Sequence, residues 1–305
     1  MGWLLAGPMG LSGRQIRRLK FQEDGILLNG RRVRTSARVQ AGDWLQVTLR
    51  EPEERRMCPG QEPVSILYED ADLLAVNKPP GMVAHPSPGH YADSVLNSLA
   101  AMGKGQGRFH VLGRLDRDTS GVLLFAKHSA AAASLARQRE QGLLQKQYLA
   151  LVSGCPAEDG GEVAFPLAPA GLGRMGVSVR GKQALTRYRV VWRTPHLSLL
   201  SLTLGTGRTH QIRVHMAALG YPLLGDPFYG AVSGEGRSGL AAGDRQSLSA
   251  GTGQGGAFPG MERAALHARR LRLRQPFSGE WVFLEAPFPE DWERVCRSFG
   301  KETYL

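Results

Sequence analysis

The 305-residue sequence contains few cysteines and no long apolar run. Its three cysteines, Cys58, Cys155 and Cys296, are scattered and form no CxxC pair, so they indicate free thiols and exclude a disulfide framework or a structural zinc site. No uncharged apolar run approaches the roughly 20 residues that span a bilayer. The apolar start, residues 1–11, has no basic segment before it and does not fit a signal peptide. We expect a cytoplasmic protein with no membrane partner.

Signals for a metal or a nucleotide cofactor are also missing. There is no P-loop, and the GLGRMG match to GxGxxG at 171–176 follows prolines and precedes a predicted strand, whereas a dinucleotide site needs strand, turn and helix. His210 and His215 are five residues apart, while two zinc ligands on one helical face are four apart. We therefore expect no metal and no cofactor.

Acidic residues are too few to balance the basic ones. The chain has 38 Lys and Arg against 27 Asp and Glu, a net charge of +11, and a sequence pI near 10.0. Residues 1–50 alone carry nine basic and three acidic side chains, which is more than half of the surplus. This distribution favours a polyanionic partner, most simply a nucleic acid.

One charged stretch, GRLDRDTSG at 113–121, lies between two apolar runs at 109–112 and 122–126. Both runs are short and partly β-branched, which is typical of buried strands, and Asp, Ser and Gly between them indicate a loop. Such a loop can present a reactive carboxylate beside fixed cations. It can equally be a surface turn with an Asp–Arg pair, and spacing alone leaves both interpretations open.

The stretch resembles the signature loop HRLDxxTSG of the RluA-type pseudouridine synthases, with Gly113 where His is usual. The resemblance implies that Asp116 is the essential carboxylate. It also implies that Arg114 fills the gap left when a uridine is flipped out of its stack.

Three further segments resemble motifs of the same family. NKPPGMVAHP at 77–86 resembles NKPxGxxxHP, and we expect its Lys78 to have a structural role or to contact RNA. KQYLALV at 146–152 implies that Tyr148 lies in the uridine pocket. GRTHQIRVH at 207–215 implies an ion pair between Arg213 and Asp116, and adds Arg208 as an RNA contact.

Residues 11–50 resemble the ribosomal S-four type of RNA-binding module, with a basic helix beginning after Ser12 and running over 13–23. In that module a basic helix and an adjoining loop lie against the phosphate backbone. The alternative is a solvated basic face. The implied phosphate contacts are Arg14, Arg17, Arg18, Lys20, Arg31, Arg32 and Arg34.

The order of motifs predicts an α+β protein with a mainly antiparallel mixed sheet, flanking helices and a central catalytic cleft. We expect an S-four-like module at 1–50, a linker at 51–63 and a catalytic domain at 64–305. Nine glycines and one aromatic residue over 231–260 predict a flexible insert in that domain. We expect a monomer.

The predicted activity is isomerisation of uridine to pseudouridine in ribosomal or transfer RNA. The N1–C1′ bond breaks and the base rejoins through C5, without a cofactor. The first alternative is a non-catalytic RNA-binding or ribosome-assembly factor on the same scaffold, although such a protein would not need Asp116, Tyr148 and Arg213 together. The second is a hydrolase, but a glycosidase normally uses two carboxylates across the bond. The order of bond-making at Asp116 stays open.

Overall fold

The computed structural model describes residues 1–49, 58–60, 62–87, 89–104, 109–230 and 260–300. Most of the predicted linker 51–63 and all but the last residue of the predicted insert 231–260 lie outside the described residues. No helix in the described part of the chain is long and apolar enough to cross a bilayer.

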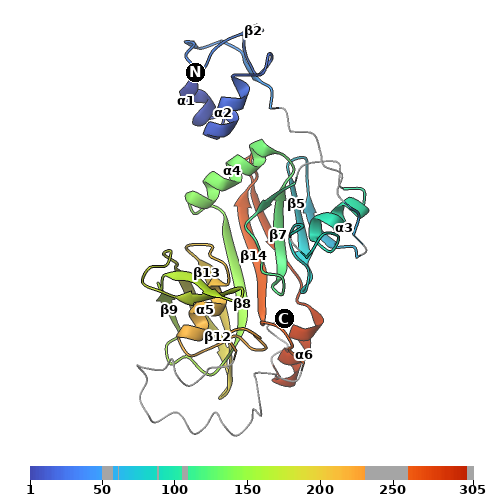
Figure 1. Cartoon of the computed structure of the whole chain (residues 1–305), viewed down its shortest axis with the longest axis vertical. Helices are drawn as coiled ribbons and strands as arrows, with labels where there is room; N and C mark the ends of the chain where they lie inside the picture. The colour runs from blue at the N-terminus through green and yellow to red at the C-terminus, as the bar shows by residue number, and fades with distance from the viewer. Residues whose placement is uncertain (50–57, 61, 88, 105–108, 231–259, 301–305) are drawn as a thin grey trace.

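The N-terminal residues form a small module with its own core (Figure 1). Leu5, Leu11, Leu19 and Ile26 are its buried side chains. Ser12 caps α2 as predicted, because its hydroxyl accepts from the Gln15 amide while the Gln15 side chain returns to the Ser12 amide. The helix ends at Leu19, short of the predicted residue 23. The elements are α1 (Gly2–Ala6), α2 (Gly13–Leu19), β1 (Ile26–Leu28), β2 (Arg31–Arg32) and β3 (Leu45–Val47), with antiparallel strand order β2-β1-β3.

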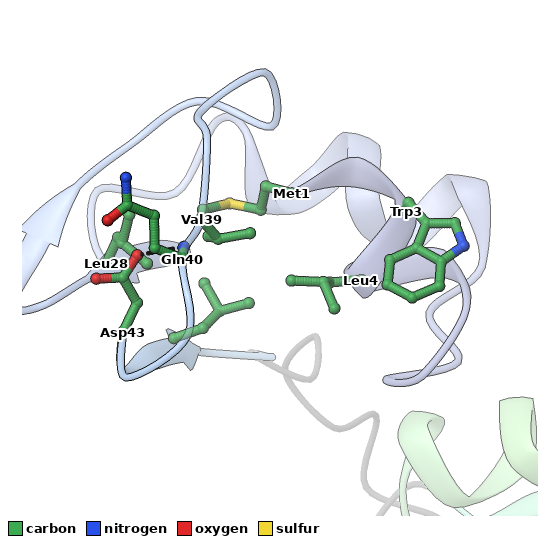
Figure 2. A pocket seen from close by; sticks show the side chains of 8 residues that line it. Met1, Trp3, Leu4, Leu28, Val39, Gln40 and Asp43 are labelled. Atoms are coloured by element: carbon green, nitrogen blue, oxygen red, sulfur yellow. Dashed lines mark hydrogen bonds between the residues drawn. The ribbon is translucent and has the colours of Figure 1, made fainter.

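A cavity of about 420 Å³ opens between α1 and the small sheet of this module (Figure 2). It lies wholly within the module, so none of its lining residues belongs to a motif expected to be catalytic. The lining side chains are Met1, Trp3, Leu4, Leu28, Val39, Gln40, Asp43 and Leu45.

The second domain is built on a ten-stranded sheet, which confirms the predicted α+β class with a mainly antiparallel mixed sheet (Figure 1). The strand order is β4-β5-β7-β14-β8-β13-β12-β9, with β15 paired to β14 and β6 paired to β7. Among the strands that the structure describes, only β14 and β7 pair in parallel. The strands are β4 (Ser65–Glu69), β5 (Leu73–Lys78), β6 (His110–Leu112), β7 (Ser120–Ala126), β8 (Gln145–Ser153), β9 (Gly160–Val163), β12 (Thr186–Arg193), β13 (Leu197–Leu204), β14 (Leu266–Arg274) and β15 (Trp281–Glu285).

Helices cover this sheet where its apolar side chains gather. Side chains of α3 (Val95–Ala101) and α5 (Gln211–Ala218) join the largest core, which includes Leu123 of β7 and Tyr148 of β8. A second core lies under α4 (Ser129–Glu140), and α6 (Glu290–Ser298) packs on a third around Trp192. The sheet therefore carries Tyr148 on the same buried face as α5.

Several local details bear on the sequence-based expectations, which favour Ser129 as the cap of the helix over 130–141 and Thr209 as the cap of the helix that runs to about Leu219. GLGRMG forms the turn of a hairpin, β10 (Leu167–Gly171) and β11 (Arg174–Val177), so no helix follows it and a dinucleotide site is excluded there. Helix α4 is capped by the His128 side chain rather than by Ser129. Helix α5 follows His210, which has a left-handed backbone with φ of 53°, rather than Thr209. Helix α6 was not predicted.

Candidate active site

The loop that carries Asp116 joins β6 to β7 and is held mainly by its backbone. The Thr119 amide donates to the Asp116 carbonyl (3.1 Å), and the Arg117 carbonyl accepts from Lys78 Nζ (2.7 Å). The Asp116 side chain is 26% exposed. Within the described residues its carboxylate accepts no hydrogen bond and has one ion-pair partner within 4.0 Å, Arg213. The loop thus presents a carboxylate that is fixed in position but free to react.

Lys78 lies behind this loop and is completely buried. Its ammonium donates to the carbonyls of Pro79 (2.8 Å), Met82 (2.6 Å) and Arg117 (2.7 Å). Burial lowers the pKa of Lys78 to about 7, although these three carbonyls favour the charged form. The burial corrects the expectation that Lys78 contacts RNA and favours the structural role, in which it ties the Asn77–Met82 turn to the Asp116 loop.

Arg213 on α5 is 3% exposed and has two acidic neighbours. Its Nη1 lies 3.9 Å from Asp116 Oδ2, so the structure brings the two residues of the expected pair together. Its closer partner is Asp226, since Nε donates to Oδ2 and Nη2 donates to Oδ1, both at 2.7 Å. This two-point geometry is the strongest form of a guanidinium–carboxylate contact.

Asp226 is the site residue that sequence reasoning missed. Its side chain is fully buried, and Oδ1 also accepts from the amides of Phe228 (2.9 Å) and Tyr229 (3.2 Å). Burial alone would lower the pKa of the Arg213 guanidinium, but the hydrogen bonds to Asp226 and the charges of Asp226 and Asp116 raise it. The available signal was Gly-Asp-Pro at 225–227, a turn dipeptide that follows a buried run.

Aromatic rings surround the remaining faces of the Arg213 guanidinium. Its Cζ lies 5.3 Å from the centre of the Phe228 ring and 5.2 Å from that of Tyr229. The Tyr229 hydroxyl pairs with His210 Nδ1 at 2.9 Å, and burial lowers the pKa of His210. Two hydrogen bonds and two rings therefore leave Arg213 little freedom to turn.

Tyr148 on β8 is 5% exposed and lies in the largest core. Burial raises the pKa of its hydroxyl, and the negative charge of Asp116 raises it further. The hydroxyl therefore stays protonated near neutral pH. The structure places an aromatic ring with a neutral hydroxyl within the electrostatic reach of the Asp116 carboxylate.

The predicted RNA contacts lie in separate places on the surface. Arg114 is exposed, and its Nη2 donates to Thr209 Oγ1 (3.0 Å), which joins the Asp116 loop to the start of α5. Arg208 is exposed, and its Nε donates to the Gln183 carbonyl (3.1 Å). In the N-terminal module, all of the following are exposed: Arg14, Arg17, Arg18, Lys20, Arg31, Arg32 and Arg34.

Metal binding has no support among the residues that the structure describes, where no group of three or more His, Cys, Asp or Glu could hold an ion. His215 is buried, with Nδ1 on Thr186 Oγ1 and Nε2 on the Phe165 carbonyl, both at 2.9 Å. The site consists instead of one accessible carboxylate, a neutral tyrosine and a fixed arginine.

Comparisons with known proteins agree with this arrangement. A family model described as RNA pseudouridylate synthase matches residues 72–218. An uncharacterized RNA pseudouridine synthase of Bacillus subtilis is 36% identical, over 92% of this chain and 88% of its own length. A ribosomal large subunit pseudouridine synthase D of Zymomonas mobilis is 37% identical, over 85% of this chain and 80% of its own length.

Solved structures give the same result. Human RNA pseudouridylate synthase domain containing 4 superposes with a TM-score of 0.57 at 28% identity, and covers 76% of this chain and 92% of its own. A second human protein, RNA pseudouridylate synthase domain containing 1, superposes with a TM-score of 0.54 at 30% identity. The match covers 76% of this chain and 87% of that protein's chain. On these matches the chain belongs to the RluA-type family of RNA pseudouridine synthases and is an isomerase that acts on RNA.

Proposed function

We propose that this isomerase converts uridines of large-subunit ribosomal RNA, with Asp116 as the reacting carboxylate. Relatives from Zymomonas mobilis, Haemophilus ducreyi and Pasteurella multocida are named for the large ribosomal subunit, and they are 35–37% identical to this chain. Transfer RNA is the second candidate substrate.

One observation carries the assignment of Asp116. Two carboxylates flank Arg213, and only that of Asp116 is partly exposed, because Asp226 is fully buried and its oxygens are occupied. Arg213 supplies a positive charge that favours the ionised form of the free carboxylate without competing for all of its lone pairs. A carboxylate that acts as a nucleophile or base must be both ionised and accessible to the substrate.

The other roles follow from position. We assign Tyr148 to supporting the uracil ring and to the departure of the C5 proton after C5 has bonded to C1′ and N1 has been released. Arg114 enters the gap in the stack after the uridine has flipped. A glycosidase is disfavoured, since the second carboxylate at Arg213 is that of Asp226, which is fully buried and hydrogen-bonded to the guanidinium.

The remaining expectations belong to the same proposal. The exposed basic side chains of the N-terminal module serve as phosphate contacts in the manner of an S-four module. The protein works in the cytoplasm, where its RNA substrate is made, and as a monomer, since one chain supplies Asp116, Tyr148, Arg213 and Asp226.

The test compares two aspartates of one loop. Asp116→Asn removes the reactive oxygen and little else, so we expect pseudouridine formation to fall by about three orders of magnitude or more, while RNA binding stays within a few-fold. Asp118→Asn is the matched control, because Asp118 is 33% exposed and its nearest cation, Arg117, is 4.0 Å away. We expect Asp118→Asn to keep its activity within a few-fold.

The measurement is pseudouridine content by chemical labelling in ribosomal and transfer RNA from cells with and without the gene, followed by the purified variants on the identified RNA. Turnover by Asp116→Asn at a rate near that of the wild type would remove Asp116 from the mechanism. Loss of a site in transfer RNA alone would reject the ribosomal substrate and keep the chemistry.

A further inference from the structure

The outer face of β14 and β15 carries an ordered array of arginines and aromatic rings far along the sheet from Asp116. Arg270, Arg272 and Arg274 alternate along β14 and are exposed, while Leu271 and Leu273 between them are buried in the core under α4. This alternation places the three guanidinium groups on one face of the strand.

The partner strand continues the array across the register. Arg274 pairs with Trp281, and Arg272 pairs with Phe283. The Cζ of Arg272 lies 3.9 Å from the centre of the Trp281 ring and 5.8 Å from that of Phe283, and the Cζ of Arg274 lies 4.6 Å from the Trp281 ring. Phe283 is 68% exposed. The surface is thus a layer of stacked planar groups, which we call the arginine–aromatic face (Arg272, Arg274, Trp281, Phe283).

Acidic side chains neutralise only one end of this region. Glu285 forms ion pairs with Arg270 at 2.7 Å and with Arg269 at 2.6 Å. Arg272 and Arg274 form no ion pair with any residue in the described ranges, and Arg274 Nη1 donates to the Gly279 carbonyl (3.0 Å). Two guanidinium groups without an acidic partner in the described ranges therefore lie beside an exposed phenylalanine.

We propose that the arginine–aromatic face binds unpaired nucleotides of the substrate RNA. Bases stack on aromatic rings and on guanidinium planes, while the arginine charge is available to the phosphates. A paired helix would offer only its backbone and could not use Phe283. The proposal rests on the RNA-directed activity of the family and adds a contact surface outside the catalytic pocket.

The register shows which part of the RNA this surface can contact. Tyr148 pairs with Ala268 across β8 and β14, and Gln147 pairs with Arg270. Neighbouring positions on a strand face opposite sides, so the arginine–aromatic face looks away from the side of the sheet that holds Tyr148. It therefore contacts a segment of RNA other than the nucleotides in the pocket.

The experiment measures binding without a reactive uridine. The probe is a fluorescein-labelled 12-nucleotide oligocytidylate, titrated with the full-length protein at several salt concentrations. Phe283→Ala should weaken binding by about fivefold or more with an unchanged salt slope, because it removes stacking and no charge. The double variant Arg272→Gln with Arg274→Gln should weaken binding. It should also reduce the magnitude of the slope of log K against log salt by about 1 to 2.

A control removes two exposed charges elsewhere, one of which, Arg297, is paired with Glu293. Arg294→Gln with Arg297→Gln on α6 should change binding by less than about twofold. The same series on a 12-base-pair RNA duplex should show no effect of Phe283→Ala. An equal loss of RNA affinity in the β14 and α6 double variants would mean that only the net charge of the protein matters. Unchanged binding by Phe283→Ala would overturn the stacking role. Because the probe has no uridine, neither result depends on the role of Asp116.

Discussion

The two segments that supply carboxylates to Arg213 differ in how they hold them. The Asp116 loop presents a side chain that is 26% exposed and forms no hydrogen bond within the described residues, whereas Asp226 in the 225–229 segment is fully buried and accepts four, two from Arg213 and two from backbone amides of its own segment. The difference shows a division of labour. The Asp226 carboxylate holds Arg213 in place. Arg213 in turn places a positive charge beside the Asp116 carboxylate, whose oxygens stay available for the substrate.

Breaking the ion pair between Asp226 and Arg213 should have the largest effect on stability. Asp226→Asn leaves the Arg213 guanidinium buried without its counter-ion, and we expect a loss of about 3–5 kcal/mol in the free energy of unfolding. Arg213→Gln should have a similar effect, because it strands Asp226. The double variant removes both charges and should recover a large part of the loss, which denaturant unfolding of all three would measure.

An exposed pair provides the control for this cycle. Glu162 contacts Arg187 on the sheet surface, and both side chains are more than half exposed. Glu162→Gln should change the free energy of unfolding by less than about 1 kcal/mol. If Asp226→Asn were as mild as Glu162→Gln, the buried pair would not fix Arg213.

A neutral histidine supports the strand that follows the Asp116 loop, so acid should destabilise this part of the site. Ser120, which begins β7 directly after the loop, bonds through Oγ to Nδ1 of the buried His267 (2.9 Å). Burial lowers the pKa of His267 from 6.5 to about 4. Between pH 6.5 and pH 4 this histidine is protonated in the unfolded chain but stays neutral in the folded chain. The free energy of unfolding should therefore fall by about 3 kcal/mol as the pH falls from 6.5 to 4.

The comparison of wild type with His267→Gln isolates this contribution from that of the carboxylates. The variant should be less stable at pH 7 but should lose less on acidification. His85→Gln, at an exposed histidine, is the control and should follow the wild-type curve. Parallel curves for wild type and His267→Gln would mean that the histidine is not kept neutral.

The smallest effect on chemistry should come from the N-terminal module. Deletion of residues 1–50 removes the exposed basic side chains of α2 and β2, so RNA affinity should fall and its salt dependence should flatten. We expect KM to rise more than kcat falls. Arg31→Gln with Arg32→Gln in the full chain should flatten the salt slope by about 1 to 2, and an unchanged slope would assign these side chains to solvent.

Local patterns predicted the elements well where the sequence signal is itself local. The apolar patterns of residues 197–204 and 281–285 predict strands over these ranges, and β13 and β15 have these bounds. Ser12 caps its helix as predicted. The start of α5 was misplaced by one residue, because His210 takes a left-handed backbone and bonds to Tyr229 from a distant segment. Sequence spacing carries no information about that partner.

The site shows the same limit. The motifs brought Asp116, Tyr148 and Arg213 to attention, and the structure brings Asp116 within 3.9 Å of Arg213. The burial of Lys78 depends on three carbonyls, one of them 39 residues away at Arg117. The role of Asp226 likewise depends on α5 meeting the 225–229 segment, since a carboxylate in a turn is ordinarily a solvated group.

The parallel pairing of β14 with β7 has a consequence for synthesis. Among the strands that the structure describes, only β15 is synthesised after this central strand, which separates β7, beside the Asp116 loop, from β8, which bears Tyr148. Until residue 274 is available, the two halves of the sheet share no strand, and the contact that joins them closes a gap of 147 residues between Ser120 and His267. Such non-local pairing forms slowly. A nascent chain that ends before residue 274 therefore has the Asp116 loop and Tyr148 without their alignment, and we expect activity to begin only after β14 has been made.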